Sequence, residues 1–191
     1  MRRTSETAVR SAQAGLLGLL AVAGTALGTT IGGTEFDIEY WAGTGVNQAV
    51  MVVDFAATGG QSYSFGFQWD GTATGYDMVQ AVAAAGALDF AATTFPGFGT
   101  YIDNFFCGSE AGNVSYYWQY FTGTPAGGTV AWTSSMIGMS DRILSDGSVD
   151  GWYNGFDPGV SPHLPEPATA LFLAAGGFLL SRRAICRPRG A

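Results

Sequence analysis

The sequence predicts an α+β fold: a β-rich, β-grasp-like single domain in which one helix packs on an antiparallel sheet. Short segments rich in β-branched and aromatic residues recur through the middle of the chain. Helical periodicity is confined to one stretch that ends at residue 85. About 130 residues, 29–157, lie between two end segments of different composition, which is enough for one domain with a modest core.

The alternation of apolar and polar residues predicts seven strands. They are 36–42, 49–56, 63–69, 88–93, 113–121, 130–133 and 151–153. The helix is predicted over 77–85, with Thr74 or Gly75 at its entry and Gly86 as the C-terminal cap. Its narrow apolar stripe is Met78, Val79 and Val82. Strands on both sides of one helix favour a helix laid over one sheet face.

Residues 1–28 have the composition of a signal peptide. The first ten residues carry three arginines, Arg2, Arg3 and Arg10. Residues 14–28 are uncharged and rich in Leu, Ala and Gly, and they end in small residues that a signal peptidase reads. Cleavage is predicted between Gly28 and Thr29, after export by the general secretion route.

The C-terminal segment 165–191 has three parts in a fixed order. Pro165, Glu166 and Pro167 precede an apolar membrane helix predicted over 168–181, and a basic tail, 182–191, begins at Arg182 and Arg183. The uncharged run of 13 residues from Ala168 to Leu180 would form a helix of about 20 Å. That length is short of the roughly 30 Å hydrocarbon core, so we expect a transient membrane segment with its arginines on the cytoplasmic side.

This order resembles the PEP-CTERM tail of proteins that exosortase handles in Gram-negative bacteria. The resemblance implies recognition of Pro165-Glu166-Pro167 by a membrane enzyme and export of the body to the cell surface or the exopolysaccharide matrix. Exosortase and signal peptidase are then partners during export, and the chain is membrane-anchored until the tail is processed. The alternative is a tail-anchored protein whose prolines only interrupt the chain before its anchor.

The body is strongly acidic once both ends are set aside. Between Thr29 and Leu164 the only basic residue is Arg142, against 13 of the 15 acidic residues, all but Glu6 and Glu166. A formal charge of −12 (13 acidic, one basic) excludes nucleic acids and anionic membranes as partners of the body. It suits calcium, cationic ligands or neutral glycans, and plain solubility is the alternative explanation.

The two cysteines are predicted to end on opposite sides of the membrane. Cys107 lies in the body and Cys186 in the basic tail, so neither a disulfide framework nor a cysteine metal site is expected. Cys107 is predicted to be a small buried hydrophobic residue. Residues 158–164 are expected to tether the body to the tail.

Residues 62–154 carry a second resemblance. The helix at 74–85 is followed by the segment 99–103 (Gly-Thr-Tyr-Ile-Asp), the aromatic run 116–120 and a closing stretch, 137–152, that contains Leu-Ser-Asp-Gly. These pieces, in this order, resemble the DUF4430 or transcobalamin-like C-terminal domain, which implies a β-grasp-like module. Ser148 departs from the family's Asp-Gly-Asp turn, and the family's helical partner domain for cobalamin is absent from the sequence.

No catalytic residues are predicted. The chain has one histidine, His163, and no lysine in the body, so a Ser-His-Asp or Cys-His arrangement would need a residue of the tether. The acidic residues stand in no recognisable glycosidase or protease context. The sequence therefore predicts that the protein is not an enzyme.

One segment has the spacing of a calcium loop. Oxygen-bearing side chains occupy positions 1, 3, 5, 9 and 12 of a twelve-residue stretch with glycine at position 6. They are Asp146, Ser148, Asp150, Asn154 and Asp157. Because Pro158 follows, no exit helix can form, and a tight turn before a strand is the alternative. No cofactor other than this calcium ion is predicted.

Aromatic residues provide a candidate ligand surface. Alternation along 113–121 puts Tyr116, Trp118 and Tyr120 on one face of the strand. Trp132 and Trp152 are candidates to join them, either in the core or as a platform for a sugar ring or planar ligand. The sequence thus predicts an exported matrix or surface protein, with a small-ligand binding module for corrinoids or glycans as the alternative.

Overall fold

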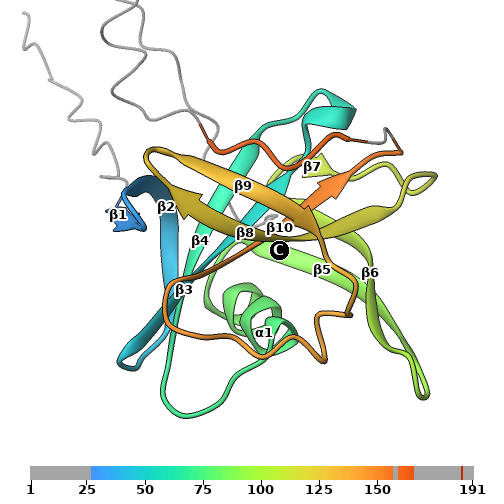
Figure 1. Cartoon of the computed structure of the whole chain (residues 1–191). Helices are drawn as coiled ribbons and strands as arrows, with labels where there is room; N and C mark the ends of the chain where they lie inside the picture. Colours follow the sequence, from blue (N-terminus) through green and yellow to red (C-terminus); the bar gives the residue numbers. More distant parts are fainter. Residues whose placement is uncertain (1–26, 157–158, 166–185, 187–191) are drawn as a thin grey trace, which may run out of the picture.

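The computed structural model describes residues 27–156, 159–165 and 186 (Figure 1). Within these residues, ten strands form two sheets, and the chain also contains one α-helix and one 3-10 helix. In chain order they are β1 (Leu27–Ile31), β2 (Thr34–Gly43), β3 (Asn47–Asp54), η1 (Ala56–Thr58), β4 (Ser62–Trp69), α1 (Gly75–Ala85), β5 (Leu88–Phe95), β6 (Gly99–Cys107), β7 (Glu110–Ala111), β8 (Trp118–Ala126), β9 (Thr129–Ser134) and β10 (Ser148–Asn154). This β-rich arrangement with one helix confirms the α+β class.

The larger sheet has seven strands in the order β1-β2-β4-β3-β10-β8-β9, and the smaller one has the order β5-β6-β7. The expectation of a purely antiparallel sheet is wrong, because β2 pairs with β4 and β3 pairs with β10 in parallel. Both parallel pairs join strands that are not consecutive in the chain, and such connections are long enough to return the chain in the same direction.

The main core lies between one face of the large sheet, α1 and the small sheet. Alternate residues of β4 point into it: Tyr63, Phe65, Phe67 and Trp69. The predicted stripe of α1 is confirmed, because Met78, Val79 and Val82 are all fully buried in this core. Burial of these large apolar side chains supplies most of the stabilisation of the fold.

Side chains fix both ends of α1. Thr74 and Asp77 form a capping box: the Asp77 N–H donates to Thr74 Oγ1, and the Thr74 N–H donates to Asp77 Oδ2 at 2.8 Å. At the other end the Tyr40 hydroxyl donates to the Val82 carbonyl oxygen. Burial raises the pKa of Tyr40 to about 12, so this hydroxyl remains a donor at neutral pH.

A second core fills the opposite face of the large sheet. Its buried members are Ile31, Phe36, Ile38, Val50, Val52 and Val149. Val130 and Trp132 of the edge strand β9 pack against them. The Thr34 hydroxyl also donates to the Thr129 carbonyl oxygen at 2.7 Å, which joins the β1–β2 end of the sheet to the β8–β9 hairpin. The sheet is therefore curled, and Figure 1 shows the β8–β9 hairpin reaching toward β2.

Several strands differ from the expectation. β1, β6 and β7 were not predicted, and β8 starts at Trp118 instead of residue 113. The start shifts because residues 113–116 form a turn in which the Tyr116 N–H donates to the Asn113 carbonyl oxygen. β6 lacks clear alternation, and its pairing with β5 depends on a tight turn with Gly97 at φ +80°.

The end segments fall largely outside the described residues. The first 26 residues of the predicted signal peptide and the predicted membrane helix 168–181 are not described. Gly28 and Thr29 lie in β1, where they pair with Asp37 and Phe36 of β2. Within the described ranges, no helix is long and apolar enough to cross a membrane.

Candidate functional site

The segment 159–165, which leads into the predicted sorting motif, lies against the domain. Pro162 is buried, and Leu164 and Pro165 are half-buried. Most of the predicted tether therefore packs on the body. Glu166, Pro167, Arg182 and Arg183 lie outside the described residues.

His163 is held at its backbone and at its ring. The His163 N–H donates to Asp54 Oδ2 at 2.8 Å, and the ring Nδ1 lies 2.7 Å from the same oxygen, the spacing of an N–H donor and a carboxylate. The Asp54 side chain is fully buried, whereas that of His163 is 64% exposed. The Ser62 hydroxyl donates to the His163 carbonyl oxygen. Asp54, Ser62 and His163 together are called the clamp below.

The residues on both sides of His163 pack on the curled face of the sheet. Pro162 lies over Gly151, where an added Cβ would be 2.9 Å from Pro162 Cγ and 2.7 Å from Trp132 Cζ3. Leu164 packs against the second core. The clamp thus lies beside a strip of apolar contacts, and the two together fix the chain just before Pro165.

The clamp contains the residue types of a Ser-His-Asp relay in a different arrangement. Asp54 pairs with Ser62 across β3 and β4, and Asp54 contacts the His163 ring as the orienting carboxylate of such a relay does. The Ser62 hydroxyl, however, is directed at the backbone of His163 and not at its ring. This arrangement anchors the segment 159–165 to the ends of β3 and β4.

A buried polar cluster joins β8, β10 and the start of α1. The Tyr120 hydroxyl donates to Asp150 Oδ2, and Arg142 Nη2 lies 3.5 Å from Asp150 Oδ1. The only arginine of the body therefore faces a fully buried carboxylate. Burial raises the pKa of Asp150, and the contacts with Tyr120 and Arg142 oppose the shift only in part. Burial and the nearby Asp150 charge also raise the pKa of Tyr120.

Asp150→Asn is expected to flatten the dependence of stability on pH. Since the folded-state pKa of Asp150 lies above the unfolded value of 3.8, the folded protein binds this proton more tightly. The free energy of unfolding should then fall as pH rises from about 4 through the raised pKa. Thermal unfolding of both proteins from pH 4 to 7 measures the difference. A wild-type slope that the substitution leaves unchanged would contradict the role given to Asp150.

Three of the five predicted calcium residues lie in a strand and not in a loop. Ser148, Asp150 and Asn154 lie in β10, where they extend over about 20 Å of strand. Asp146 instead accepts the Gln48 N–H, and Asn154 accepts the Asn113 N–H at 2.6 Å. Asp157 lies outside the described residues, within which no three His, Cys, Asp or Glu side chains are grouped to hold a metal.

The residues of the predicted aromatic platform do not lie together on one surface. Trp118 and Trp152 are buried in the main core, and Tyr120 stacks on Trp152 with ring centroids 4.7 Å apart. Trp132 packs on the second core. Tyr116 is partly exposed and contacts Phe156, with the two ring centroids 5.2 Å apart.

Three exposed aromatic side chains, Tyr116, Tyr117 and Phe156, form a group of their own. Phe156 also contacts Tyr117, with ring centroids 5.0 Å apart, and both side chains are more than half exposed. The sequence pattern missed this trio of Tyr116, Tyr117 and Phe156. It depends on a contact between two segments about 40 residues apart in the chain.

The two cysteines are joined in the structure, so the expectation that they stay apart is wrong. Cys107 and Cys186 form a disulfide with Cα atoms 5.1 Å apart and a sequence separation of 79. Both are buried in the main core, which confirms the burial expected of Cys107. The expectation failed because it placed the basic tail across the membrane from the body, whereas the bond requires both residues on one side.

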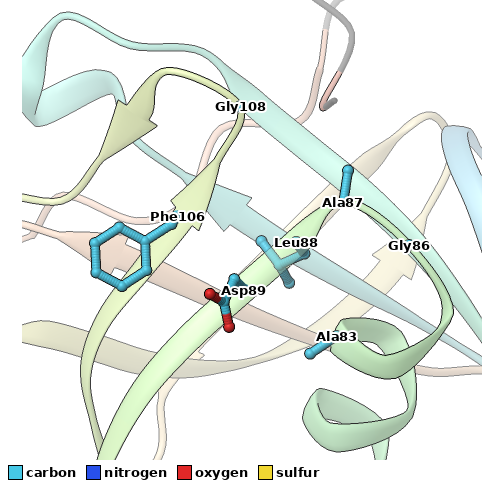
Figure 2. A pocket seen from close by; sticks show the side chains of 7 residues that line it. All are labelled: Ala83, Gly86, Ala87, Leu88, Asp89, Phe106 and Gly108. Atoms are coloured by element: carbon cyan, nitrogen blue, oxygen red, sulfur yellow. The ribbon is translucent and has the colours of Figure 1, made fainter. Parts of the chain in front are cut away.

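A shallow depression lies beside Cys107, between the end of α1 and the β5–β6 pair (Figure 2). Its volume is about 260 Å³, below the usual range for pockets that enclose a drug-sized ligand. The lining residues are Ala83, Gly86, Ala87, Leu88, Asp89, Phe106 and Gly108. Asp89 is their only ionisable side chain, so the depression offers few groups to orient a bound molecule.

Comparison with protein-family models and with curated proteins finds no match to this chain. The chemistry of its own residues therefore carries the functional proposal.

Proposed function

We propose that this is an exported protein, without catalytic activity, that an exosortase-type enzyme sorts to the cell surface or exopolysaccharide matrix of a Gram-negative bacterium. The observation that carries the proposal is the order of the C-terminal segment. Pro165-Glu166-Pro167 precedes an uncharged run, and Arg182-Arg183 follows it. The arginine-led apolar segment at the N-terminus gives an independent reason to expect export.

The disulfide supports the export part of the proposal. Disulfides persist in oxidising compartments such as the periplasm and the cell exterior. A tail whose arginines remain in the cytoplasm cannot form the Cys107–Cys186 bond. The bond therefore belongs to chains whose tail has not entered the membrane or has left it.

A second candidate function is a small-ligand binding module on a β-grasp-like domain spanning residues 62–154. The exposed trio of Tyr116, Tyr117 and Phe156 favours it, because aromatic rings stack on sugars and planar ligands without formal charge. Neutral glycans suit the acidic body, and corrinoids enter only through the resemblance to the transcobalamin-like domain. The trio, and not the buried Trp118 or Trp152, is where such a ligand would bind.

Replacing Pro165, Glu166 and Pro167 together with alanine is expected to stop processing of the tail. The variant should accumulate as a membrane-bound precursor, because the sequence read by the sorting enzyme is gone while the apolar run remains. Immunoblots of membrane, surface and medium fractions measure the outcome. Ser161→Ala, a change in the same docked segment, is the matched control. A triple variant that matures and distributes like the wild type would contradict the proposal.

A further inference from the structure

We propose that the clamp of Asp54, Ser62 and His163 controls access to the sorting motif and has to release before the motif can be processed. This inference rests on the proposed function, since it concerns the same C-terminal site. It assigns a positioning role to three residues that lie outside the motif itself.

The first step of the argument is distance along the chain. The motif begins at Pro165, two positions after His163, and an extended chain advances at most about 3.5 Å per residue. Pro165, the first residue of the motif, therefore lies within about 7 Å of the clamp. Enzymes that recognise extended peptides contact the backbone over several consecutive residues. On the N-terminal side of the motif these residues are packed on the sheet, so an enzyme cannot surround them while the segment is docked.

The second step is the cost of release. Asp54 Oδ2 accepts the His163 N–H and contacts the ring nitrogen, and Asp54 Oδ1 accepts the Ala56 N–H at 2.7 Å. The carboxylate is fully buried, so loss of His163 leaves it with an unsatisfied oxygen until water enters. The docked state is therefore favoured.

The third step is that the clamp can open alone. His163 is largely exposed, and the described segment meets the rest of the domain at one strip of the surface. Short segments with few buried contacts open locally without unfolding of the domain. The folded body thus slows processing of its own tail and keeps the motif from unrelated proteases until the sorting enzyme captures the open segment.

The test is a pulse–chase measurement of tail processing in cells that contain the sorting enzyme. His163→Ala removes the ring contact with a charged group and should speed loss of the tail by about tenfold. Ser62→Ala, which removes the contact at the His163 carbonyl, should act in the same direction. Ser161→Ala is the control and should leave the rate unchanged. An unchanged or slower rate in both clamp variants would overturn the proposal.

Hydrogen exchange of the purified full chain tests the clamp without the enzyme. The His163 amide should be protected in the wild type and exchange faster in Asp54→Asn, whose neutral side chain is a weaker acceptor. Rapid exchange of this amide in the wild type would overturn the clamp.

The alanine-substituted motif separates the two proposals. If that variant is still processed, the sorting function fails. If it is not processed and the clamp variants keep the wild-type rate, only the clamp fails.

Discussion

Replacing Trp152 with alanine is expected to destabilise the protein by about 3–5 kcal/mol, the usual cost of truncating a large buried aromatic side chain. Trp152 is 1% exposed in the main core. Its ring stacks on Tyr120 and meets Phe105 edge-on with centroids 5.8 Å apart. The cavity would open between the two sheets, where strands on both sides restrict collapse. Urea unfolding followed by circular dichroism measures the loss.

Trp132→Ala is the matched control for Trp152. The same side chain is removed from the edge strand β9, where it is only half-buried against the second core. Its loss should cost clearly less, since less apolar surface is buried there. Equal losses for the two substitutions, or a small loss for Trp152, would contradict the division of the protein into these two cores.

Gly45→Ala is expected to cost about 3 kcal/mol through a backbone clash and an unfavourable conformation. Gly45 has φ +154°, and a Cβ there would lie 2.0 Å from the Trp69 carbonyl carbon and 2.6 Å from the Asp70 nitrogen. Both neighbours are main-chain atoms, which cannot rotate away as a side chain can. The expected result is a lowered melting temperature in a thermal scan.

Gly71→Ala separates the two causes of the Gly45 effect, the backbone clash and the unfavourable conformation. Gly71 also has a positive φ, +71°, but an added Cβ would meet nothing within 4 Å. Its substitution should cost about 1 kcal/mol from conformation alone. If Gly45→Ala cost no more than Gly71→Ala, the close approach between Gly45 and the Trp69 backbone would be contradicted.

The helix was predictable because its signals are local. Thr74, Asp77 and Gly86 mark its ends within a dozen residues, and its apolar stripe has the helical period. The small sheet was harder to predict. β6 has buried and exposed residues in no strict alternation, and its pairing with β5 shifts register near Ala91. Pairings between distant strands, such as the parallel contact of β3 with β10, leave no local pattern.

The candidate site was less predictable than the fold. His163 stood out as the only histidine, but its partner Asp54 lies 109 residues away, inside a segment that the sequence predicts only as a strand. Asp150 was predicted as a calcium ligand from the spacing of oxygen side chains, and that spacing does not indicate its place in β10. Asp150 is buried beside Arg142 because the loop preceding β10 packs at the start of α1, where the Gly75 N–H donates to the Arg142 carbonyl oxygen. The sequence contains no local signal for this contact.

Mass spectrometry of the reduced mature protein, isolated from the cell surface and the medium, tests the central claim most directly. Export and sorting predict a chain that begins close to Thr29 and ends close to Pro165-Glu166-Pro167, without the arginines of the tail. A surface-located chain that still ends at Ala191 would contradict processing at the motif. A chain that also retains Met1 would contradict export through a cleaved signal peptide.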